Sequence, residues 1–294
     1  MIVVTLMWSV AGVVTRHLEA ARSFEVTFWR SLFNALALGA ALTVMRGPAL
    51  WTGLLRAPWP VWLSGVCWSV MFTAFMVAIT MTSVAGVLIT MSVAPLITAL
   101  FARLALHHHL PPRTWGAIAA AGAGIAWMFG RDAQAAGSTA WAGMLVAAAV
   151  PVASAINYTL LQHTSRGQSG GQSDMLPAVL IGAVLSTVVT LPLALPFQAS
   201  PHDLGWLAML GVFQLAIPCL LIVRLTRQLP APEIALLGLL EVLFGVLWAW
   251  LGADEQPSSA ALLGGSLVLG ALVFNELLGW RRAARPARSA RVQP

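Results

Sequence analysis

Charged residues are scarce in this 294-residue sequence: Asp, Glu, Lys and Arg make up only 9% of it, whereas 59% of the residues are hydrophobic. A chain of this composition cannot cover a folded surface with polar groups, which excludes a water-soluble globular protein. Its mean hydropathy of +0.84 is instead typical of a protein that crosses a membrane several times. We therefore expect the whole chain to form one membrane domain.

Cysteine is also rare, and the two residues present, Cys67 and Cys219, lie in apolar runs where a thiol behaves as a small apolar group. No disulfide framework is predicted. The sequence lacks Gly-x-Ser-x-Gly, and every histidine lies at or beyond the end of an apolar run, so we do not expect an intramembrane hydrolase or any other enzyme.

Three consecutive histidines, His107, His108 and His109, resemble a metal site at first sight. Adjacent side chains on a helix or turn point in different directions, and neither a cysteine nor an acid lies nearby in the sequence. The triplet is interpreted as a polar cluster at the membrane surface. No metal site and no cofactor are predicted.

Lysine is absent, so all 16 basic residues are arginines, and the formal net charge is +6. With a cytoplasmic amino terminus, twelve arginines lie on the inner side, at positions 46, 56, 103, 113, 166, 224, 227, 281, 282, 285, 288 and 291. Only Arg16, Arg22 and Arg131 then lie in outer loops. The positive-inside rule predicts an inner-membrane protein with both termini in the cytoplasm. Its basic tail is expected to face anionic membrane lipid, and no nucleic-acid partner is predicted.

Ten apolar runs have about the length that a membrane-spanning helix needs, which is about 20 residues for a hydrocarbon core about 30 Å thick. They cover residues 1–15, 24–45, 59–80, 84–106, 114–130, 138–161, 174–197, 204–226, 231–252 and 258–279. The predicted fold is an all-α membrane protein with ten transmembrane helices.

The ten runs divide into two sets of five, and an odd number of crossings inverts the second set relative to the first. A shift of 147 residues, half the chain, places Leu96, Leu100, Ala102 and Leu104 over Leu243, Leu247, Ala249 and Leu251. After a one-residue gap, Gly116 and Gly122 meet Gly264 and Gly270. We expect two inverted repeats, residues 1–130 and 131–280, followed by a cytoplasmic tail, 281–294. Transporters built in this way bind substrate near the midplane, between the repeats.

Several segments carry a familiar pattern: LGVFQLAIP at 210–218, LLEVLFGVLWAWL at 239–251 and EQPSSAALLGG at 255–265. Trp8 and Ser9, Arg30, SVAPL at 92–96 and Trp115-Gly116 belong to the same pattern. The sequence resembles the EamA family of the drug/metabolite transporter superfamily over nearly its whole length. This resemblance implies an inner-membrane carrier, usually an exporter of amino acids or drug-like metabolites that works by alternating access.

The sequence departs from the family pattern at two places. The three histidines stand where the family closes its fourth helix with Gly-Glu, while Glu255, the counterpart in the ninth helix, is kept. The ninth helix reads Leu240-Glu241-Val242 in place of Leu-Glu-Pro, which leaves open whether that helix is broken. Pro95, which aligns with Val242, is retained.

Glu241 is the leading candidate for a functional residue, because it lies in the apolar run 234–251, where hydrocarbon disfavours a charge. It could be a protonated structural residue bonded to a neighbouring helix, or part of a ligand or proton site. As a site residue it could couple transport to protons. Alternatively, it could pair with an ammonium group of a small-molecule metabolite whose carboxylate Arg30 holds.

Other candidates share this ambiguity between structure and binding. Arg30 could extend outward to the membrane surface or face the cavity. Trp8 and Trp68 could pack between helices or shape an amphipathic pocket, and Asn157 and Gln214 could join helices or contact substrate. Apart from Arg30 no cation lies deep enough to bind phosphate, which argues against a nucleotide-sugar carrier. A non-transporting scaffold or regulatory membrane protein is the alternative function.

Overall fold

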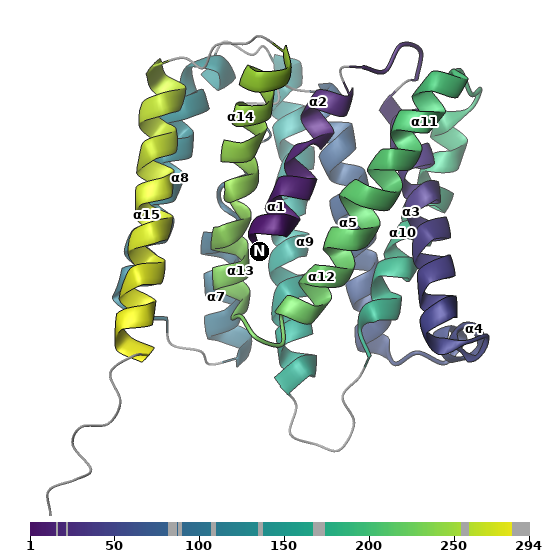
Figure 1. Ribbon diagram of the computed structural model, residues 1–294, viewed down its shortest axis with the longest axis horizontal. Coiled ribbons are helices and arrows are strands. Elements are labelled where there is room, and N and C mark those ends of the chain that lie inside the picture. Colours follow the sequence, from purple (N-terminus) through teal and green to yellow (C-terminus); the bar gives the residue numbers. More distant parts are fainter. Residues whose placement is uncertain are drawn as a thin grey trace, which may run out of the picture.

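The computed structural model describes residues 1–15, 17–21, 23–81, 87, 90–106, 110–134, 138–166, 174–253 and 259–283. These residues form helices, turns and short connections, with no strand among them. The expected all-α fold is confirmed. The helices stand side by side as a bundle, with the loops gathered at its two ends (Figure 1).

The first half of the chain contains α1 (Ile2–Ser9), α2 (Ala11–Thr15), α3 (Ser23–Arg46), α4 (Ala49–Leu55), α5 (Trp59–Met81), α7 (Ala94–Leu106) and α8 (Pro112–Gln134). The second half contains α9 (Ser138–Arg166), α10 (Leu176–Ala194), α11 (Pro201–Met209), the π-helical η1 (Leu210–Ala216), α12 (Ile217–Leu225), α13 (Ala231–Gly238), α14 (Leu240–Ala253) and α15 (Ser259–Ala283). We call the end of the bundle near α2 and α11 the upper end and the end near α4 the lower end, as they stand in Figure 1.

Five helical segments are long and apolar enough to cross a membrane: Phe24–Arg46, Trp59–Ile79, Ala142–Thr164, Leu176–Ala194 and Pro201–Leu225. Three shorter apolar segments accompany them, Ile2–Thr15, Ala94–Ala105 and Leu262–Asn275. The outer faces of the helices carry exposed apolar side chains such as Val188 on α10 and Phe274 on α15, as lipid contact requires. The protein is therefore a multi-pass membrane protein, and the count of ten crossings stays a prediction.

Besides a turn at Ser92 and Val93 within the predicted run 84–106, just before α7, two of the predicted helices are divided. The run 1–15 forms α1 and α2, separated at Val10, and the run 231–252 forms α13 and α14, separated at Leu239. At the second break the Leu239 amide donates to the Leu236 carbonyl and the Val242 amide to the Leu239 carbonyl, both at 3.1 Å. These bonds span three residues in place of four, which tightens the helix locally. The ninth helix is thus broken without a proline at Val242.

Helix α4 was not expected from the sequence. It follows α3 directly because Gly47 adopts a left-handed backbone conformation with φ of 70° and lets the chain turn sharply. The Gly47 amide donates to the Thr43 carbonyl at 2.7 Å, which ends α3. The turn places α4 at the lower end of the bundle (Figure 1).

The two halves contact each other reciprocally. In the first half α5 and α7 pack on α9, the first helix of the second half. In the second half α12 and α14 pack on α1, the first helix of the first half. The corresponding pairs α3 with α10 and α8 with α15 also lie against each other. This exchange of equivalent contacts fits two related halves.

Glycine allows the closest of these approaches. A Cβ atom on Gly182 of α10 would overlap the Cβ of Trp68, and one on Gly65 of α5 would overlap the side chain of Ile181. The two glycines face each other where α5 crosses α10, as small residues do in membrane helix pairs. Their contact fixes the position of Trp68.

Candidate functional site

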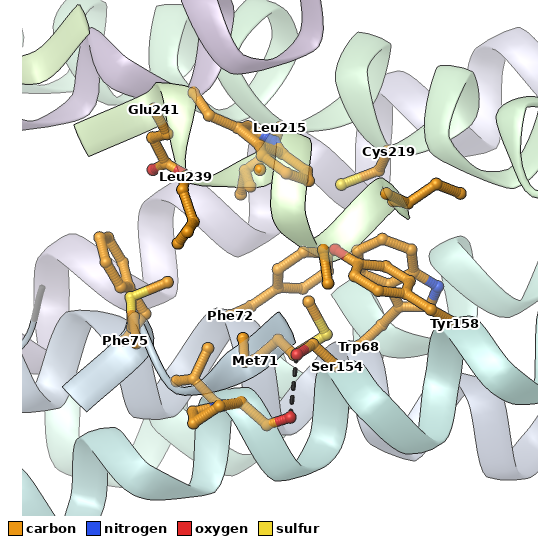
Figure 2. Close-up of a pocket in the computed structure, with 18 of the residues that line it drawn as sticks. Trp68, Met71, Phe72, Phe75, Ser154, Tyr158, Leu215, Cys219, Leu239 and Glu241 are labelled. Atoms are coloured by element: carbon orange, nitrogen blue, oxygen red, sulfur yellow. Dashed lines mark hydrogen bonds between the residues drawn. The ribbon is translucent and has the colours of Figure 1, made fainter. Parts of the chain in front are cut away.

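A cavity lies at the middle of the bundle, between the two halves. Its walls come from α1, α3, α5, α7, α9, η1, α12, α13 and α14. The volume that the centres of water molecules could occupy is about 120 Å³. Figure 2 shows the lining side chains, with Glu241 across the cavity from an aromatic group. The expected position between the repeats agrees with this location.

The aromatic group consists of Trp68, Phe72 and Tyr158. The rings of Trp68 and Phe72 stack with centroids 5.6 Å apart, and Tyr158 meets Trp68 edge-on at 6.5 Å. Met71 and Phe75, which lie on α5 like Trp68 and Phe72, extend this wall (Figure 2). One side of the cavity can therefore hold an apolar or aromatic part of a solute.

Two charged side chains face the same cavity, Arg30 from α3 and Glu241 from α14. Arg30 is only 2% exposed, and its Nη2 donates to the Phe72 carbonyl at 3.1 Å. Its Nε has no hydrogen-bond partner among the described residues. No direct ion pair joins Arg30 and Glu241 in the part of the chain that the structure describes. Arg30 faces the cavity and does not extend to the membrane surface.

Irregular helices contribute to the cavity wall. Because Leu239 and Val242 donate to nearer carbonyls, the carbonyls of Ala235 and Gly238 lack the amide donors that a continuous helix would provide. Both residues line the cavity, as does Pro151, whose ring removes an amide from α9. Backbone groups without a helix partner are tolerated at membrane depth where the segment lines a cavity.

Five of the residues predicted for the site line this cavity: Trp8, Arg30, Trp68, Gln214 and Glu241. The Gln214 Nε2 donates to the Trp8 carbonyl at 3.2 Å, while its Oε1 has no partner among the described residues. Gln214 therefore joins η1 to α1 and also presents a free acceptor close to the cavity. Contact of these five residues with a substrate stays a prediction.

Asn157 lies beside the cavity but does not line it. Its Oδ1 accepts a hydrogen bond from the Ser64 hydroxyl at 2.6 Å, which joins α9 to α5 inside the protein. Of the two roles considered for this residue, the geometry favours the link between helices.

Two further residues of the family pattern, Ser9 and Pro95, do not line the cavity. The Ser9 hydroxyl donates to the Leu6 carbonyl at 2.8 Å and accepts from the Trp248 indole at 2.9 Å, which fastens α1 to α14. Pro95 lies in the first turn of α7, where its missing amide costs nothing. Glu255 and the three consecutive histidines lie outside the described residues.

Several cavity residues were not predicted from the sequence, among them Tyr158, Ser154 and Cys219. Tyr158 could have been noticed, because it is the only tyrosine in the chain and lies deep in an apolar run. Ser154 and Cys219 carry no such signal, since small residues are common throughout the membrane helices.

Two buried carboxylates close the upper end of the bundle. Glu25 at the start of α3 accepts the amides of Gln198 and Ala199, both at 2.8 Å. Asp203 at the start of α11 accepts the amides of Glu19, Ala20 and Ala21 between 2.9 and 3.1 Å. Each helix thus holds the loop that leads into the other. An apolar cluster from α2, α3, α5 and α11 lies below them, and the cavity residue Phe75 packs against it.

Comparison with known families agrees with a cavity that lies between two related halves. The EamA-like transporter family matches residues 1–130 and 141–276, in two blocks that correspond to the two halves of the bundle. The chain belongs to the EamA-like transporter family. This family is not a class of enzymes, and membership implies a small-molecule substrate and embedding in a membrane.

A solved structure supports the fold of this EamA-like protein. A chain described as "Crystal structure of protein" aligns over 96% of both chains with a TM-score of 0.77 and 20% sequence identity. At that identity the likeness concerns the fold alone. Comparison with curated protein sequences gives no match.

Proposed function

We propose that this protein is a secondary transporter that moves small zwitterionic or cationic metabolites, such as amino acids, out of the cell across the inner membrane. The observation that carries this proposal is the presence of Arg30 and Glu241 in one cavity, on α3 and α14 of opposite halves. Alternating access would follow from movement of one half against the other around this cavity.

The arrangement suits a solute with two charged groups and an apolar body. Glu241 would hold an ammonium group, and Arg30, with its unpartnered Nε, would hold a carboxylate. The wall formed by Trp68, Phe72 and Tyr158 would accept the apolar part. Because the two charges form no direct ion pair, a bound zwitterion would satisfy both at once.

Proton coupling is a second role that Glu241 could have. Hydrocarbon disfavours the charged carboxylate, so uptake of a proton in one conformation and release in the other could drive export. In this role, binding of the substrate would displace the proton from the Glu241 carboxylate. The two roles differ in the effect of pH on transport.

The test is transport by the Glu241→Gln variant, which keeps the size of the side chain. Cells that produce the wild type or the variant are screened with metabolites and toxic analogues, and membrane levels are measured in both. We expect loss of export at normal membrane levels, whereas Glu19→Gln, which changes an exposed carboxylate, should export normally. Normal transport with unchanged pH dependence in Glu241→Gln would refute the site, and flattening of the pH dependence alone would favour proton coupling.

The proposal also requires that both termini face the cytoplasm. A periplasm-active phosphatase fused after Arg288 should be inactive, whereas fusion within residues 131–137 should give strong activity. The reverse pattern would refute the orientation. A scaffold or regulatory role would be indicated if no solute changed its retention when the protein is produced.

A further inference from the structure

A second cavity lies at the lower end of the bundle, beside α4. Its walls come from Arg46 at the end of α3, from α4, from the turn that leads into α5, and from Asp174 and Pro177 at the start of α10. The space open to the centres of water-sized molecules is about 400 Å³, which is larger than in the central cavity on the same measure. No residue lines both cavities.

Positive charge exceeds negative charge around this second cavity. Arg46 and Arg56 line the cavity. Arg227 lies close enough to Arg46 for their positive charges to repel each other. The only acid among the lining residues is Asp174, which forms an ion pair with Arg46. A guanidinium has five N–H donors, so this pair leaves further donors of Arg46 for another acceptor. The cavity therefore favours an anion.

The surroundings of the cavity suit the level of lipid headgroups. Helix α4 buries Leu50 against the protein, while Trp51 and Leu55 are 47% and 80% exposed. Trp59 and Trp62 at the start of α5 are exposed as well. Exposed indoles beside arginines are typical of the boundary between hydrocarbon and water. The cavity thus lies where phosphate groups of the membrane are found.

We propose that this second cavity binds a phosphate group through Arg46 and Arg56. Guanidinium groups bind phosphate with paired, charge-assisted hydrogen bonds, and Asp174 would hold Arg46 in position for this contact. The phosphate would come from the headgroup of an anionic lipid or from a soluble phosphate ester at the same membrane face. The proposal does not depend on the transport function.

The test measures binding through thermal unfolding of the purified full-length protein in a neutral detergent. Dioleoyl phosphatidylglycerol, dioleoyl phosphatidylcholine or inorganic phosphate is added to the wild type, to Arg56→Gln and to Arg103→Gln. Both arginines are exposed in the structure, so neither variant should disturb folding. Arg103 in the last turn of α7 is the matched control, because it lies outside the cavity.

We expect phosphatidylglycerol to raise the unfolding midpoint of the wild type and of Arg103→Gln, and phosphatidylcholine to have little effect. Arg56→Gln should weaken the apparent affinity for phosphatidylglycerol about ten-fold, as loss of a charge-assisted contact implies. An Arg56-dependent effect of inorganic phosphate without one of the lipid would support the site and identify a soluble source. Equal affinities in all three proteins, or equal weakening by both substitutions, would refute the proposal.

Discussion

Asp203 offers a sharp test of how the upper end of the bundle is held together. Its carboxylate is fully covered and accepts four backbone amides: Oδ1 accepts the amide of Glu19, and Oδ2 accepts those of Ala20, Ala21 and Ser200. The four distances lie between 2.9 and 3.3 Å. Substitution to asparagine keeps the size of the side chain but replaces one acceptor by an NH2 group that faces an amide donor.

The magnitude follows from these bonds. Hydrogen bonds to a charged group contribute about 1.5–3 kcal/mol each, neutral ones about 0.5–1.5 kcal/mol, and a buried donor left without a partner costs about 1–3 kcal/mol. Because Asp203 lies just beneath the surface, water screens its charge, and removal of a covered charge also recovers hydration. We therefore expect Asp203→Asn to lower the free energy of unfolding by about 2 kcal/mol.

The assay is unfolding of the purified protein in detergent, followed by circular dichroism against temperature or denaturant. Glu19→Gln is the matched control, since Glu19 contributes only its backbone amide to the bond with Asp203, and its side chain is exposed. The control should unfold like the wild type. If Asp203→Asn also unfolded like the wild type, the four amide bonds would not hold the loop, and the reasoning would be wrong.

Two further substitutions test the packing of the helices and the cavity. Gly124→Ala should destabilise the protein by about 1–3 kcal/mol in the same unfolding assay, because a Cβ there would lie 2.7 Å from a backbone oxygen of α15. Gly122→Ala, where the space is open, should be neutral or slightly stabilising, and an equal loss in both would contradict this packing. Ser154→Phe should fill the cavity and abolish transport at normal membrane levels, whereas Val152→Phe, at an exposed position of the same helix, should leave transport intact. Transport that survives Ser154→Phe would place the substrate pathway elsewhere.

The membrane character, the helical fold and the leading candidate for a site residue could be predicted from local properties of the chain. Hydropathy depends only on composition within a window, and a single carboxylate in such a window is visible at once. Glu241 was found in this way, and the structure places it in the central cavity. The leucines and glycines that match after a shift of half the chain likewise indicated two related halves, and the distribution of arginines predicted the orientation, without any contact being known.

The sequence could not determine which face of each helix is buried. Lipid is as apolar as the protein core, so hydrophobic periodicity does not mark the inward side of a membrane helix. For that reason Asn157 and Gln214 could not be told apart in the sequence, although one joins α9 to α5 and the other lies at the cavity. The contribution of Cys219 to the cavity wall was hidden for the same reason.

The sequence by itself therefore determined that this is a helical membrane protein with a carboxylate in an apolar run, where hydrocarbon disfavours a charge. The hydropathy of each segment depends on that segment alone. Only the tertiary structure decided that Arg30 and Glu241 line the same cavity and that the ninth helix breaks at Leu239 without a proline. It also decided that Glu25 binds the loop that leads into α11 and that Asp203 binds the loop that leads into α3. These features depend on side chains and backbone groups far apart in the chain, and only the packing of the helices brings them together.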